Sequence, residues 1–131
     1  MKGFIVNFTA FRQYEIKMKT NTFLKYLALT LGIIYATMML LLAVDSLPLK
    51  ETTTEPGGFL IHFAPGLVII LVSVYGSVRP KYGRYVFLLI TVVFTIYYET
   101  YKAVGAFMGI SFPLAAIAFI LFLASLTIND K

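Results

Sequence analysis

The feature that most constrains this chain is the stretch 59–84, FLIHFAPGLVIILVSVYGSVRPKYGR, in which a long apolar run ends in a short basic turn. A helix of about twenty residues rises about 30 Å, which is the thickness of the hydrocarbon core of a bilayer. The turn carries Arg79, Lys81 and Arg84, and short basic loops stay on the cytoplasmic side of a membrane. The stretch therefore predicts a membrane-spanning helix whose basic end lies in the cytoplasm.

The composition of the whole chain favours the same class of protein. Of its 131 residues, 60% are hydrophobic and only 13% are charged, and the mean hydropathy is +0.86, whereas soluble domains carry about 25% charged residues. The net charge of +5 is concentrated beside apolar runs, which indicates membrane topology and not a nucleic-acid partner. The chain has no cysteine, which excludes disulfides, thiolate metal sites and cysteine nucleophiles.

Three further apolar runs complete the predicted domain, which covers residues 23–128. Polar or glycine-rich segments separate the runs, and short connections make successive helices antiparallel. The sequence thus predicts an all-α fold, an integral membrane four-helix bundle with up-down topology. Its predicted spans are 23–47, 59–78, 85–105 and 112–128.

Residues 1–22 form a separate N-terminal segment in this interpretation. Phe4, Phe8 and Phe11 recur at helical spacing among basic residues, a pattern typical of an amphipathic helix on a membrane surface. A disordered leader is the alternative, and the sequence alone leaves both open. The apolar run that follows is too long for the core of a secretory signal.

The distribution of lysine and arginine predicts how the bundle is oriented. Nine of the eleven basic residues lie in the N-terminal segment and its junction with the first span, in the basic turn, or at the C-terminus, and only Lys50 and Lys102 lie on the other side. This bias predicts a multi-pass protein of the cell membrane with both termini in the cytoplasm. Besides the lipid bilayer, a homo-oligomer or a membrane-protein partner is compatible with the pattern.

Four ionisable residues lie within or at the ends of the predicted spans, and all fall in the non-cytoplasmic half: Asp45, His62, Glu99 and Lys102. Ionisable side chains are costly in a membrane and usually face the bundle interior or a water-filled cavity. Tyr98 and its neighbouring tyrosines would surround this layer as hydrogen-bonding rings. We therefore consider these five residues the candidate ligand-binding or proton-handling site.

Two functions are compatible with such a layer. An outward-facing polar pocket would bind or translocate a small solute, an ion or a proton, with His62 and Glu99 as titratable partners. Alternatively, the layer fixes the register of the helices in a non-catalytic accessory or assembly subunit. A metal site from Asp45, His62 and Glu99 needs a convergence that spacing does not show, and Lys102 would oppose a cation. No catalytic motif is present, so we predict no enzyme, no metal and no cofactor.

Small and hydroxyl-bearing residues predict which helix faces point inward, because small side chains let helices approach closely in lipid. Gly76 and Gly105 are expected to serve packing or helix termination. The predicted inward faces contain Thr30, Thr37 and Asp45; His62, Gly66, Ser73 and Ser77; Thr91, Thr95, Glu99 and Lys102; and Ser111, Ala115, Ala118 and Ser125.

Two short motifs resemble those of a family of small, uncharacterised four-span membrane proteins of bacteria and archaea. Leu42-Ala43-Val44-Asp45 is similar to the Ala-Leu-Asp motif that ends their first span, and Ile61-His62-Phe63-Ala64-Pro65 to the Ile-His-Leu-x-Pro motif that begins their second. The chain departs from these motifs at Val44 and Ala64, and it has no tryptophan before the basic turn. The resemblance implies a helical bundle, carries over Asp45, His62 and Pro65, and supplies no function.

Overall fold

The computed structural model describes residues 2–45 and 56–127, and side chains at 7–44 and 63–127. The described residues are all-α, without a strand. Between the long helices α3 and α5, the chain makes three short helical turns of 3-10, α and π type. The elements are α1 (Lys2–Asp45), α2 (Pro56–Val78), α3 (Pro80–Tyr97), η1 (Thr100–Lys102), α4 (Val104–Ala106), η2 (Phe107–Ser111) and α5 (Phe112–Leu126).

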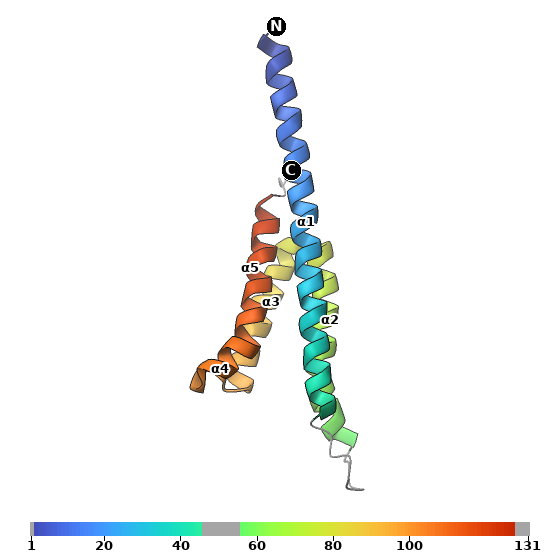
Figure 1. Ribbon diagram of the computed structural model, residues 1–131, viewed down its shortest axis with the longest axis vertical. Helices are drawn as coiled ribbons and strands as arrows, with labels where there is room; N and C mark the ends of the chain where they lie inside the picture. The colour runs from blue at the N-terminus through green and yellow to red at the C-terminus, as the bar shows by residue number, and fades with distance from the viewer. Residues whose placement is uncertain (1, 46–55, 128–131) are drawn as a thin grey trace.

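Helix α1 is a single unbroken rod that extends well beyond the other helices (Figure 1). Its 44 residues correspond to about 66 Å at 1.5 Å per residue. Residues 2–22, which we expected to form a separate segment, therefore continue the helix of the first span. No proline interrupts 2–45, and the Thr20 and Thr22 hydroxyls at the expected boundary are satisfied by carbonyls of the same helix one turn earlier.

The long helices pack as two pairs, α1 with α2 and α3 with α5, and α1 also packs along α5. Helices α2 and α3 meet through a tight turn at Arg79, whose N–H donates to the Tyr75 carbonyl at 2.8 Å and whose carbonyl accepts from the Gly83 N–H at 2.9 Å. At the opposite end, the α4 tip of the α3–α5 pair diverges from the α1–α2 pair (Figure 1). The α3–α5 pair therefore separates from the α1–α2 pair toward α4, while the basic turn holds α2 and α3 together.

Glycine makes the close helix contacts possible. A Cβ atom on Gly83 of α3 would overlap the Cα atom of Gly76 of α2, and a Cβ on Gly76 would lie 2.9 Å from Leu121 Cδ1. A Cβ on Gly32 of α1 would overlap the Ser73 side chain. The prediction that Gly76 serves packing is confirmed, whereas nothing would lie within 4 Å of a Cβ on Gly105.

Apolar side chains from all four long helices form the core between them. Phe87 and Leu114 are completely buried, and alanines line the closest approaches. The core cluster contains Ala28, Tyr35, Ala36, Ile69, Phe87, Phe94, Leu114, Ile117, Ala118 and Leu121.

Two parts of the predicted inward faces are wrong. Thr30 and Thr37 are exposed, and the Thr37 hydroxyl donates to the Ile33 carbonyl at 2.8 Å. A hydroxyl that bonds its own helix needs no interior partner, so Thr37 is not forced inward. By contrast, Gly66, Ser73 and Ser111 are buried, as predicted.

The third predicted span also ends earlier than expected. Helix α3 begins at Pro80 and ends at Tyr97, and Glu99 adopts the left-handed conformation with φ 50° and ψ 35°. A left-handed residue cannot continue an α-helix. Glu99 and Lys102 therefore lie beyond α3 and do not share its Thr91–Thr95 face.

Within the described residues, two helices are long and apolar enough to cross a membrane. One is the Asn7–Val44 part of α1, and the other is Val104–Leu126, which joins α4, η2 and α5. The Phe63–Val78 part of α2 is a shorter apolar helix. Helix α3 carries Lys81 and Arg84 in its first turns, which lowers its hydropathy.

Candidate functional site

Glu99 and Lys102 pair with each other beyond the end of α3. Lys102 Nζ donates to Glu99 Oε2 at 2.6 Å, and both side chains are more than half exposed. An exposed ion pair contributes at most about 1 kcal/mol, while left-handed backbone at a residue other than glycine costs about 1 kcal/mol or more. The pair therefore marks a strained, accessible corner of the fold.

Tyr98 directly follows α3 and packs on its aromatic neighbours. Its ring lies edge-on to the rings of Phe94 and Tyr97, at centroid distances of 5.6 and 5.0 Å. Burial raises the pKa of the Tyr98 phenol, and repulsion from the Tyr97 phenolate raises it further. Tyr98 is therefore neutral at physiological pH and can donate a hydrogen bond to a ligand.

The remaining two predicted site residues lie at the ends of the α1–α2 pair. Asp45 is the last residue of α1 and His62 is in the second turn of α2, but their side chains lie outside the described residues. The structure thus pairs Glu99 with Lys102, while Tyr98, the preceding residue, packs on Phe94 and Tyr97. The convergence of Asp45 and His62 with them stays a prediction. Among the described residues, no three His, Cys, Asp or Glu side chains cluster as metal ligands would.

A buried hydroxyl cluster lies next to this corner and was not predicted. Ser111 Oγ lies 2.8 Å from both Thr95 Oγ1 and Thr100 Oγ1, and both Ser111 and Thr100 are completely buried. Thr95 also donates to the Thr91 carbonyl at 2.7 Å. These hydrogen bonds tie α3, η1 and η2 together, so they fix how the chain reverses between α3 and α5.

Tyr35 joins α1 to the same region. Its ring is buried in the core, and its hydroxyl donates to the Ile110 carbonyl in η2 at 2.9 Å. In a π-helix the regular α-helical hydrogen bonds are displaced, so a side-chain donor is a natural partner for this carbonyl. The hydroxyl cluster and Tyr35 together satisfy polar groups within the protein.

A different site lies near the basic turn, on the side where α3 faces α5. Arg84 Nη1 donates to Ser125 Oγ and Nη2 donates to the Tyr85 hydroxyl, both at 2.7 Å. The guanidinium carbon also lies 4.6 Å from the centroid of the Tyr85 ring and 5.3 Å from that of Phe122. Arg84 Nε is buried and has no acceptor among the described residues. The guanidinium is therefore held in place but incompletely hydrogen bonded.

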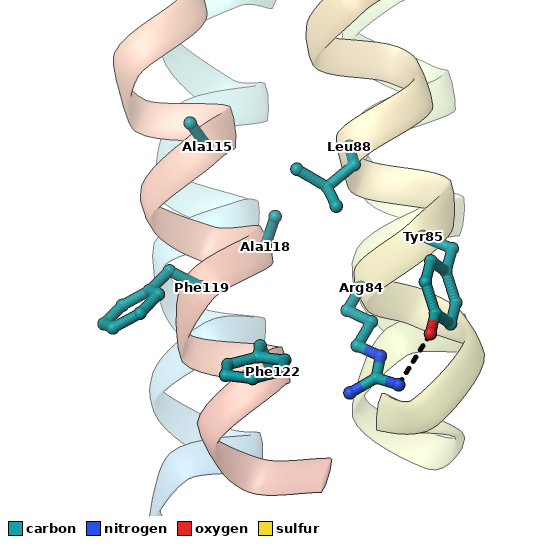
Figure 2. Close-up of a pocket in the computed structure, with 7 residues that line it drawn as sticks. All are labelled: Arg84, Tyr85, Leu88, Ala115, Ala118, Phe119 and Phe122. Carbon is teal, nitrogen blue, oxygen red and sulfur yellow. Dashed lines mark hydrogen bonds between the residues drawn. The ribbon is translucent and has the colours of Figure 1, made fainter. Parts of the chain in front are cut away.

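The Arg84 site is one end of an apolar groove, shown in Figure 2. The groove encloses about 420 Å³, a volume within the range of small-molecule sites. Its walls come from α3 on one side and α5 on the other. The lining residues are Arg84, Tyr85, Leu88, Ala115, Ala118, Phe119 and Phe122.

From the sequence, Arg84 is predicted only to be one of the basic residues that orient the helices in the membrane. The helical spacing of residues 84, 85 and 88 indicates that they lie on one face of α3. Nothing in the sequence predicts that Phe122 and Ser125 of α5 contact that face. The contact depends on the antiparallel register of α3 and α5, which brings residues 41 positions apart together.

Comparisons with known proteins place the chain in one family. No curated protein and no solved structure matches it. Residues 17–131 match the family described as DUF7670, a domain of unknown function, which agrees with the expected membership of an uncharacterised family. The matched region covers all of α2–α5 and begins within α1. The chain therefore belongs to the DUF7670 family.

Proposed function

We propose that this protein is a non-catalytic accessory subunit of the cell membrane, with four spans and both termini in the cytoplasm. Large apolar side chains are exposed on every long helix, for example Leu41, Leu71, Leu89 and Phe119, each at least 60% exposed. Soluble monomers rarely expose apolar patches larger than a few hundred Å². Lipid is the solvent in which such a surface is favourable, and this supports membrane burial of α2 and α3 as well as of α1 and α5.

The accessory role is supported by the α1 extension, residues 7–20, every one of which is exposed. The bundle begins at Asn21, whose Nδ2 donates to the Ala124 carbonyl at 2.8 Å and to Thr127 Oγ1 at 2.7 Å, at the end of α5. The extension thus projects about 20 Å beyond the last helix contact. An isolated helix of this length is only marginally stable in water, so a partner would stabilise it.

The α1 extension carries an apolar row and a basic charge. Phe8, Phe11, Tyr14 and Met18 recur at helical spacing and each is more than half exposed. Residues 7–20 contain three basic residues and one acidic residue. An exposed apolar row flanked by basic residues suits an apolar groove with an acidic rim on a partner protein. The bilayer surface suits it less well, because a helix continuous with a membrane span must break before it can lie flat.

Site-specific photocrosslinking in native membranes tests this docking. A photoreactive phenylalanine at Phe11 should crosslink one discrete protein of different mass, because this side chain lies in the apolar row. The same probe at Gln13, on the other side of the helix, should give little product. Crosslinking mainly to lipid, crosslinking to a second copy of the chain, or equal yields at both positions would contradict the proposal.

The alternative function is an outward-facing polar pocket for a small solute, an ion or a proton. It is favoured by the strained Glu99 backbone, because strain of this kind is concentrated at functional sites, and by the neighbouring Tyr98 donor. If the pocket is functional, His62→Ala and Glu99→Gln should abolish uptake or binding while the yield of folded protein stays the same. If the polar layer is structural, the same substitutions should instead lower the yield.

A further inference from the structure

The groove between α3 and α5 combines a cationic end with an apolar body. Arg84 closes one end, and among the described residues two hydroxyls accept hydrogen bonds from its guanidinium, which has five N–H donors. The buried Nε–H has no acceptor among the described residues, and leaving such a donor unpaired costs about 1–3 kcal/mol. Because Nε itself is buried, an anionic oxygen of a ligand at this end would accept hydrogen bonds from the Nη hydrogens that the two hydroxyls leave free.

The rest of the groove offers no polar partner. Besides Arg84, it is lined by the small side chains of Ala115 and Ala118, by Leu88 of α3, and by Phe119, whose ring points away from α3 in Figure 2. Leu88 and Phe119 are at least half exposed, so the groove is open to the medium around the helices. In a bilayer that medium consists of acyl chains.

The position of the groove along the helices matches the layers of a membrane. Arg84 lies in the second turn of α3, beside the basic turn with Arg79 and Lys81. On α5 the groove extends from Phe122 back to Ala115, which is about 10 Å along the helix axis. With the basic turn in the cytoplasm, the cationic end lies at head-group depth and the apolar body points into the hydrocarbon core.

We propose that this groove binds an anionic phospholipid of the cytoplasmic leaflet. The lipid phosphate accepts hydrogen bonds from the Arg84 guanidinium, and one acyl chain lies along Ala115 and Ala118. Arginine suits this role because its planar guanidinium pairs with phosphate through two parallel hydrogen bonds. The proposal rests on the membrane placement proposed above but is independent of the partner of the α1 extension.

Native mass spectrometry of the purified full chain, with phosphatidylglycerol and phosphatidylcholine of identical acyl chains, tests this site. The protein should retain one phosphatidylglycerol in preference to phosphatidylcholine. Arg84→Gln should lower this retention about tenfold, as expected for the loss of a charge-assisted pair, and Arg84→Lys should lower it less. Ala115→Leu should lower retention of phosphatidylglycerol by filling the groove.

Arg79→Gln is the matched control, because it removes the same charge from the same turn but Arg79 does not line the groove. An equal loss for Arg79→Gln and Arg84→Gln would overturn the proposal, since binding would then depend on charge alone. Undiminished retention by Ala115→Leu would exclude the acyl chain from the groove, and displacement by glycerol phosphate would show a head-group site only. Circular dichroism of each variant separates lost binding from lost folding. Labelling of introduced cysteines tests the membrane placement by itself, so a wrong membrane placement can be distinguished from a wrong lipid site.

Discussion

Replacing Gly83 with alanine is expected to lower the free energy of unfolding by about 2 kcal/mol. The added Cβ atom would overlap the Cα atom of Gly76, and backbone atoms inside a helix cannot move aside as a flexible side chain can. The helices α2 and α3 would have to separate, which would also disturb Leu121 of α5 beside Gly76. Alanine favours a helix over glycine by up to about 1 kcal/mol, and this gain is smaller than the cost of the overlap.

Gly105→Ala is the control for this substitution, because a Cβ at Gly105 would meet nothing within 4 Å. Thermal unfolding in detergent, followed by circular dichroism, should show a lower melting temperature for Gly83→Ala and an unchanged or slightly higher one for Gly105→Ala. Equal melting temperatures for Gly83→Ala and the unmodified protein would refute the close α2–α3 contact.

Ser111→Ala should also destabilise the protein by about 2 kcal/mol. The Ser111 hydroxyl lies within hydrogen-bond distance of both Thr95 and Thr100. Thr95 keeps its bond to the Thr91 carbonyl, but the hydroxyl of Thr100, which is completely buried, would lose its partner. A buried hydroxyl without a partner costs its full desolvation free energy.

Ser77→Ala provides the comparison at the other end of the bundle. The Ser77 hydroxyl donates only to the Val74 carbonyl of its own helix, at 2.8 Å, so its removal should change the stability by less than about 0.5 kcal/mol. Similar losses for Ser111→Ala and Ser77→Ala in equilibrium unfolding would mean that the hydroxyl cluster does not tie α3 to η1 and η2.

Much of the helical framework could be predicted from the sequence because its signals are local. The apolar runs predict where α2 and α5 lie within a few residues, whereas α3 begins five residues before and ends eight residues before the predicted span 85–105. Small residues in apolar helices predict close packing, and Gly76 and Ser73 do lie at helix contacts. The helical spacing of Phe4, Phe8 and Phe11 predicted one face of a helix.

The errors occurred where a tertiary contact or an unusual backbone decides the outcome. The apolar run through 85–105 gives no sign that the chain becomes left-handed at Glu99, because the reversal depends on Ser111, which approaches from η2. Asn21 was assigned to the N-terminal segment, but it is the residue that holds the end of α5. The sequence indicates only a charge in a turn at Arg84, because its hydrogen bond to Ser125 joins residues 41 positions apart.

The proposed function and the lipid site both depend on four helices crossing the membrane. Because the chain has no cysteine, single introduced cysteines can test this. Single cysteines can be introduced and labelled with a membrane-impermeant maleimide in intact cells and again after lysis. The account predicts labelling of intact cells at positions 53 and 101, and labelling only after lysis at 13, 82 and 129. Labelling of position 82 in intact cells, or protection of position 101 until lysis, would contradict it.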